Sequence, residues 1–388
     1  MGHTEIVVAR HWRPEVADVA DTLRAVLAAD EVSEVRVRGG GRWPRPSTIG
    51  RTGDVALVSD VAPAPDASLV VRLWWNGADE VLAHRASGSG TPELAVCFFP
   101  DVADELRAAG IDVVLAPYAF ATPTAAPTNG SDLVDRIGYT GEVDISEACF
   151  EPLTEADTGG RSPADLGSLA ADLAAEVVTG ASTMVTTDTD ISTGHDLGPD
   201  AARTLLWSVR NRVRHDLLAA VAETFPDALR VRGDDWKRLG FAAEPTSFNR
   251  RLRTLDYRTH RVSLDLGSKS THAALYPRSV EILAMAGGLV QFDSGEPLPP
   301  GTPGLADRRA SSAADLLEVI AAVRDLPADE LAAQNRALQQ EYAAVRLESG
   351  RILLSAITDR AAAMVENRGP AAGRGGDEPP EPSQGALT

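Results

Sequence analysis

Short apolar runs rich in β-branched residues recur through the first 120 residues and predict strands. Amphipathic helical patterns separate some of them, as at 15–29 and 102–109. Continuous apolar strands that alternate with helices are typical of parallel strands covered on both faces. Residues 1–121 therefore predict a doubly wound α/β domain. Its predicted strands are Glu5–Ala9, Glu34–Arg38, Asp54–Ser59, Ser68–Trp75, Leu94–Phe99 and Val113–Pro117.

A second α/β domain is predicted over 133–365, after a linker at 122–132 that is rich in Pro, Thr, Ala and Asn. Residues 151–200 are less regular and predict an insertion, either a mobile loop or a solvated linker, with a helical piece near Asp165–Val178. Residues 366–388 are rich in Gly, Pro and Glu, without apolar periodicity, and predict a disordered tail. The other predicted elements are strands Arg136–Glu142, Leu229–Gly233, Arg261–Leu266 and Leu289–Asp293, and helices Ala201–Phe225, Pro277–Ala286, Ser311–Arg324 and Asp329–Thr358.

Composition narrows the classes of function. The formal net charge is −19, which argues against non-specific binding to nucleic acid, because phosphate contacts need clustered Lys and Arg. Two cysteines provide neither a disulfide framework nor a Cys-based zinc site, so a reducing, cytoplasmic setting is expected. No apolar run reaches the ~18 residues of a membrane span, and no secretory signal is recognised. Oligomeric state stays open.

The most informative segment is Arg261–Pro299. Its loop Gly267–His272 follows the carboxyl end of a predicted strand, where open α/β sheets bind ligands. The next helix begins near Pro277, and a helix amino end presents unpaired N–H groups that suit a diphosphate. Arg278 in the first turn can add a phosphate contact, and Glu281, one turn later, can accept ribose hydroxyls. An exposed Arg–Glu ion pair is the alternative interpretation of this spacing.

The segment also resembles a known family. The run Tyr276–Asp293 contains Arg278, two residues, Glu281, a short helix, the pair Gly287-Gly288 and an apolar strand. It resembles the donor-site segment of GT-B glycosyltransferases, and most closely that of the spore-maturation (CgeB-like) group. The resemblance covers roughly residues 110–360, with the insertion unmatched.

The resemblance implies a GT-B architecture, in which two Rossmann-like domains face a cleft. It implies an enzyme that transfers a sugar from a UDP- or GDP-sugar to a hydroxyl-bearing acceptor, either a small molecule or a polymer. No further cofactor and no metal would be required. Many retaining members carry an additional glutamate where this chain has Ala273, so the stereochemical outcome stays open.

Individual roles follow from the resemblance. Glu281 would bind the ribose hydroxyls, and Arg278 with nearby N–H groups would bind the diphosphate. Gly233 and Trp236 would line the nucleotide pocket, and Thr140 and Gly141 would lie near the phosphates. The complete set of predicted donor-binding residues is Glu281, Arg278, Tyr276, Ser279, Thr140, Gly141, Gly233, Trp236 and His272.

Two positions are candidates for catalysis. His11 follows the first predicted strand and is suited to act as general base on the acceptor hydroxyl, with His84 and Asp60 as rivals. Lys269 and His272 flank the donor helix and can stabilise the leaving diphosphate. A solvated loop is the alternative interpretation for each of these side chains.

Other patterns carry less weight. Asp188 and Asp190 form an Asp-x-Asp pattern, but their surroundings lack the α/β rhythm, so a polar loop is favoured over a metal site. Four arginines between 203 and 214 are spread around one helix, which predicts that most are solvated. Three other functions stay open: a sugar-nucleotide epimerase, a non-catalytic nucleotide-sugar-binding protein, and a phage-type glycosyltransferase acting on modified DNA bases, which the negative charge disfavours.

Overall fold

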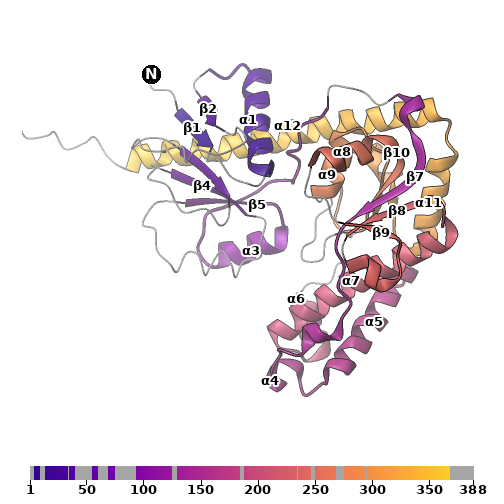
Figure 1. Cartoon of the computed structure of the whole chain (residues 1–388). Coiled ribbons are helices and arrows are strands. Elements are labelled where there is room, and N and C mark those ends of the chain that lie inside the picture. Colours follow the sequence, from indigo (N-terminus) through magenta and orange to yellow (C-terminus); the bar gives the residue numbers. More distant parts are fainter. Residues whose placement is uncertain are drawn as a thin grey trace, which may run out of the picture.

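The protein is an α/β chain built on two parallel sheets (Figure 1). Within the residues that the computed structural model describes, each sheet has six strands, and every strand pair is parallel. This confirms the predicted α/β class with two parallel-sheet units. The described residues are 4–8, 14–33, 35–39, 55–59, 69–74, 93–124, 129–183, 188–233, 235–245, 250–267, 275, 277–293 and 295–367.

The first sheet has the order β2-β1-β3-β4-β5-β6. Its central strands are buried along consecutive residues, as at Leu69, Val70 and Val71, because helices cover both faces of a parallel sheet. Helices α1 (Pro14–Ala29) and α3 (Pro100–Ala108) belong to this half. Its strands are β1 (Thr4–Val8), β2 (Val35–Gly39), β3 (Val55–Ser59), β4 (Leu69–Trp74), β5 (Glu93–Cys97) and β6 (Val113–Leu115).

The second sheet has the order β12-β11-β10-β7-β8-β9. Counted from its own first strand, this is the doubly wound order 3-2-1-4-5-6, and the direction of winding reverses between β7 and β10. The two strands pair through Val262 with Ile137 and Leu264 with Tyr139. The strands are β7 (Val134–Thr140), β8 (Leu229–Arg232), β9 (Ala243–Glu244), β10 (His260–Asp265), β11 (Leu289–Phe292) and β12 (Arg309–Ala310).

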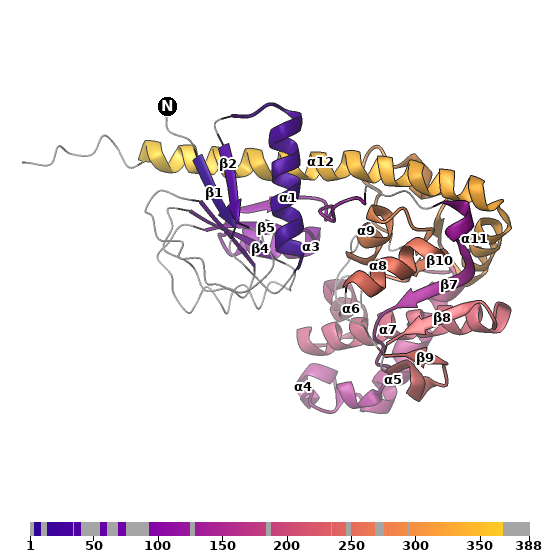
Figure 2. The ribbon, with the colours of Figure 1, turned by 45° about the horizontal axis from the view of Figure 1, so that its top comes forward.

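Different helices cover the two faces of the second sheet (Figure 2). Buried residues of α5 (Pro163–Thr179), α7 (Pro199–Thr224) and α11 (Ala313–Asp325) share one apolar core with β7, β8 and β10. Buried residues of α8 (Arg250–Thr259), α9 (Pro277–Ala284) and α12 (Ala328–Asn367) belong to a second core, which extends to the first sheet. The second core therefore joins the two halves of the chain.

Helix α12 is the main connection between these halves (Figures 1 and 2). It is 40 residues long and packs on α1, where Gly350 lies against Thr22 and Val26. The predicted boundaries place this helix in the second domain, whereas its packing involves both halves. The boundaries themselves stay predictions, and the predicted tail lies outside the described residues apart from the end of α12.

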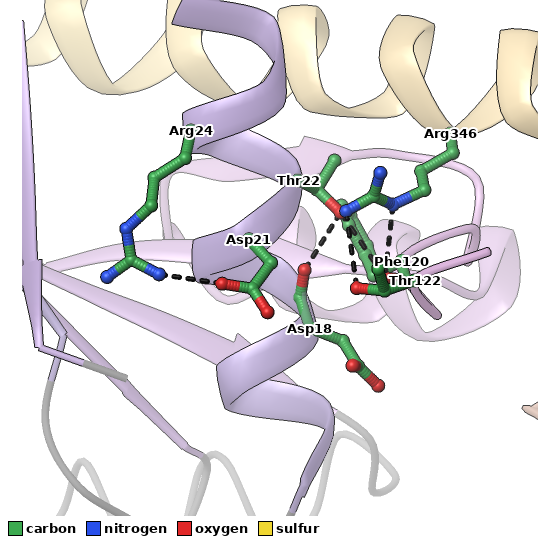
Figure 3. Close-up of polar contacts among 7 residues, drawn as sticks. All are labelled: Asp18, Asp21, Thr22, Arg24, Phe120, Thr122 and Arg346. Atoms are coloured by element: carbon green, nitrogen blue, oxygen red, sulfur yellow. Dashed lines mark hydrogen bonds and ion pairs between the residues drawn. The ribbon is translucent and has the colours of Figure 1, made fainter. Parts of the chain in front are cut away.

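The segment that leaves the first sheet is held by both helices (Figure 3). Thr22 Oγ1 and Arg346 Nε both donate to the carbonyl oxygen of Phe120, at 3.2 and 3.4 Å. The Tyr342 hydroxyl donates to the Ala121 carbonyl at 2.7 Å. Burial lowers the pKa of Arg346 below its usual value. The end of the predicted first domain, just before the linker, is thus anchored in the core between α1 and α12.

The helix expected near Asp165–Val178 in the predicted insertion is present, and further helices accompany it. The insertion contains α4 (Glu155–Thr158), α5 and α6 (Asp188–His195), and α5 packs along α7. At the start of α5, Ser162 and Asp165 form a capping box, and Gly180 ends the helix with a φ of 77°. These Ser-x-x-Asp and Gly signals are present in the sequence. Neither a loop nor a solvated linker therefore describes this segment. Among the described helices, none has the length and hydropathy to cross a bilayer.

Candidate functional site

The candidate site lies where the second sheet reverses its winding, at the carboxyl ends of β7 and β10. Asp265 is the last residue of β10 and is fully buried. Its carboxylate accepts hydrogen bonds from Gly267 N and Arg278 Nη1, at 3.2 and 3.1 Å. It also accepts from Ser279 N at 3.2 Å and from the Ser279 hydroxyl. Asp265 therefore ties the end of β10 to the first turn of α9.

Arg278 projects from that first turn over the end of β7. Its side chain is only 13 % exposed and forms an ion pair with Asp265. Its guanidinium carbon lies 5.1 Å from the centre of the Tyr139 ring, at a distance typical of a cation–π contact. A Cβ added at Gly141 would lie 2.8 Å from Arg278 Nη2. The cation is thus fixed next to the backbone that follows β7.

Two glycines permit this close packing. Gly233, just after β8, has a φ of 155°, and a Cβ there would lie 2.1 Å from the carbonyl oxygen of Gly141. The same carbonyl accepts a hydrogen bond from Trp236 Nε1 at 2.7 Å. The loops after β7 and β8 therefore pass so closely that only glycine fits at these positions.

Trp236 forms the floor beneath these loops. It is fully buried and packs edge-on against Tyr139 and Phe241, with ring centres 5.5 and 5.1 Å away. The observed contact of this buried ring is the hydrogen bond from Trp236 Nε1 that holds the Gly141 carbonyl. Ser279 is likewise buried, and its N–H and hydroxyl both donate to Asp265. The predicted ligand contacts of these two side chains stay predictions.

The remaining predicted residues are placed as follows. Glu281 is partly exposed on α9, one turn beyond Arg278. Thr140 borders a small cavity on the sheet face toward α8. Gly141, Gly233, Trp236, Arg278 and Ser279 lie together at the reversal point, and their proposed roles stay predictions. The predictions for His11, Lys269, His272 and Tyr276 fall outside the described residues, as do those for the rival bases His84 and Asp60.

Sequence reasoning missed Asp265. The available signal was a carboxylate at the end of an otherwise apolar strand, directly before the polar loop that begins at Gly267. In an open α/β sheet this position points a side chain toward the ligand crevice. Arg278 and Ser279, which donate to Asp265, lie 13 and 14 residues further along the chain. The role of Asp265 is therefore visible only in the folded structure.

The prediction that most of the α7 arginines are solvated is wrong for Arg210 and Arg214, each of which is 3 % exposed. Helix α7 packs against α5, α6 and α11, and its buried face includes Arg210 and Arg214. Arg214 Nη2 donates to Asn211 Oδ1 at 2.6 Å, and the same oxygen accepts from Asp144 N at 3.2 Å. This chain of contacts ties α7 to the loop that follows β7.

Comparison with known proteins adds no assignment. The sequence matches no protein-family model and no curated protein. In the described part of the chain, no three or more His, Cys, Asp or Glu side chains are grouped so that they could hold a metal ion. The chemistry of the site therefore has to be argued from its own geometry.

Proposed function

We propose that the chain is a glycosyltransferase that moves a sugar from a nucleoside diphosphate sugar to a hydroxyl-bearing acceptor, with a GT-B arrangement of its two sheets. The observation that carries the proposal is the reversal point of the second sheet. There the amino end of α9 and two close-packed glycine loops lie beside β7 and β10. This is where open α/β sheets bind nucleotides. The resemblance of residues 276–293 to a donor-site segment supports the choice of a nucleotide sugar.

In this proposal Arg278 neutralises the donor diphosphate. The ion pair with Asp265 and the contact with Tyr139 hold the guanidinium in place before the ligand binds. A preorganised cation needs no reorientation as negative charge develops on the leaving group, which is why such groups accelerate transfer. Asp265 is then a positioning residue, and Gly141 lets the phosphates approach the backbone.

Glu281 would bind the ribose hydroxyls, since it lies one helical turn from Arg278 and is partly exposed. UDP- and GDP-sugars are the proposed donors, and no metal is required. The first sheet would present the acceptor, with His11 as the proposed base. Transfer then rests on positioning, on stabilisation of the leaving group and on one acid–base group.

Calorimetric titration with UDP, GDP, ADP and TDP without metal tests the donor site. We expect one diphosphate to bind in the micromolar range, which is about −8 kcal/mol. Glu281→Ala should weaken it by at least about tenfold, whereas Glu318→Ala, which removes an exposed glutamate from α11, should not. If no diphosphate binds, with or without Mg²⁺ or Mn²⁺, the proposal fails. Tight binding of a nucleotide sugar without transfer or hydrolysis would instead favour a non-catalytic binding protein.

A further inference from the structure

The small polar cavity that Thr140 borders lies on the face of the second sheet toward α8. Its volume is about 30 Å³, enough for water-sized occupants. Most of the residues that line it on β7 and β8 alternate along each strand, as expected for one face of a sheet. The alternating residues are Arg136, Gly138 and Thr140 on β7, and Arg230 and Arg232 on β8, and Tyr139 of β7 also borders the cavity. Tyr139, which contacts Arg278, belongs to the core on the other face.

His260, the first residue of β10, closes one side of this cavity. It is 7 % exposed, and its Nδ1 has no hydrogen-bond partner among the described residues. Gly138 makes room for the imidazole, because a Cβ there would lie 2.3 Å from Nδ1. The strand register also shifts between His260 and Val262, and such bulges commonly re-aim side chains. A buried, unpaired nitrogen is unfavourable unless something binds it.

The charge around His260 is positive. Arg232 is paired, with Asp256 at 2.7 Å and Glu244 at 3.0 Å. No described carboxylate forms an ion pair with Arg136, and Arg230 Nη1 donates to the backbone carbonyls of Asp227 and Leu229, near the start of β8.

Two pKa values reflect this environment. Burial, followed by the charges of Arg136, Arg232 and Arg230, lowers the pKa of His260 to about 4. Burial raises the pKa of Asp256, although Arg232 opposes the shift. In a chain of net charge −19, a cavity with this excess of cations is suited to an anion.

We propose that this cavity is a phosphate-binding site, in which Arg136 and Arg230 bind the oxygens of a tetrahedral phosphate and His260 Nδ1 donates to one of them. Guanidinium groups match phosphate oxygens in geometry and charge. A cavity of about 30 Å³ holds little beyond part of the anion, so a larger molecule must extend outward past the two exposed arginines. Free phosphate and the phosphoryl group of a small monoester share this chemistry.

The direct test follows the imidazole nitrogens of the full-length protein by NMR during titration with sodium phosphate at pH 7. The His260 signals are assigned from a His260→Gln variant. We expect phosphate to shift the His260 nitrogens, and sodium chloride at equal ionic strength to leave them unchanged. A parallel titration with glycerol 3-phosphate distinguishes the sources. Binding of the monoester assigns the site to a phosphoryl group on a larger molecule, and its exclusion assigns the site to the free ion.

Variants provide the second measurement. Arg136 and Arg230 are exposed, so Arg136→Gln and Arg230→Gln should fold normally, which circular dichroism checks. Each should weaken phosphate binding by about tenfold, as expected for loss of one charge-assisted contact. Arg238→Gln, which removes an exposed arginine outside the cavity, is the matched control and should have no effect. The proposal is overturned if millimolar phosphate leaves the His260 signals unchanged, or if the two variants bind phosphate as well as the native chain.

Discussion

Asp265→Asn tests whether the buried carboxylate at the reversal point holds the candidate site together. The native carboxylate accepts from Gly267 N, from Arg278, and from both the N–H and hydroxyl of Ser279. Asparagine has the same size but only one acceptor oxygen. Donors face both oxygens of the native carboxylate. In either orientation of the asparagine amide, its NH₂ group would therefore face donors that need an acceptor. Arg278 would also lose its counter-charge.

The size of the effect follows from burial. Breaking a buried ion pair by removing one partner costs about 3–5 kcal/mol, because the remaining charge is uncompensated. Asp265 is fully buried and Arg278 nearly so, and therefore little solvent screening reduces this figure. For the second half of the chain, such a loss corresponds to a decrease in Tm of about 6–20 °C.

Thermal and urea unfolding, followed by circular dichroism, measure this loss. The matched control is Asp135→Asn, which breaks a pair with Arg324 whose carboxylate is 60 % exposed. An exposed pair contributes less than about 1 kcal/mol, so the control should lower Tm by only a few degrees.

A double-mutant cycle with Arg278→Met isolates the interaction, and we expect a coupling of about 1–3 kcal/mol. If Asp265→Asn is no less stable than the control, or the coupling is near zero, the site is not held by this ion pair.

Three further substitutions have defined outcomes. Gly233→Ala should lose at least about 2 kcal/mol of stability, because its Cβ would lie 2.1 Å from a backbone oxygen. Gly240→Ala is the control: Gly240 has a φ of 85° and open space around it, so this variant should lose only about 1–2 kcal/mol. Equal losses in urea unfolding would refute the steric argument. Tyr342→Phe leaves the Ala121 carbonyl without its donor and should cost about 1–2 kcal/mol, and an unchanged Tm would contradict a role for this bond at the junction. The pKa of His260 is about 4 in the folded protein, below its ordinary 6.5. As the pH decreases, the unfolded chain therefore takes up the proton before the folded protein does. The free energy of unfolding should fall by up to about 3 kcal/mol between pH 6.5 and pH 4. His260→Gln should remove that part of the pH dependence, and identical pH profiles for both proteins would show that His260 is not the cause.

Local sequence was sufficient for most of the secondary structure. Apolar runs of five or six residues, such as Leu69–Trp74, became buried parallel strands because such runs leave no polar face for water. The capping signals at Ser162 and Gly180 were also present in the sequence, on either side of the helix expected near Asp165–Val178. Two strands of two residues each were too short to show a periodicity, and the arginine-rich helix α8 was not predicted.

By itself, then, the sequence determined most of the elements and the parallel character of both sheets. Strand order was decided only by the tertiary structure, because it depends on which helices pack across which sheet face. The partners of Asp265, the path of α12 onto α1 and the burial of Arg210 and Arg214 follow from the same packing. Hydrophobic periodicity is a property of neighbouring residues, whereas the pairing of a buried charge depends on residues that only the folded chain brings together.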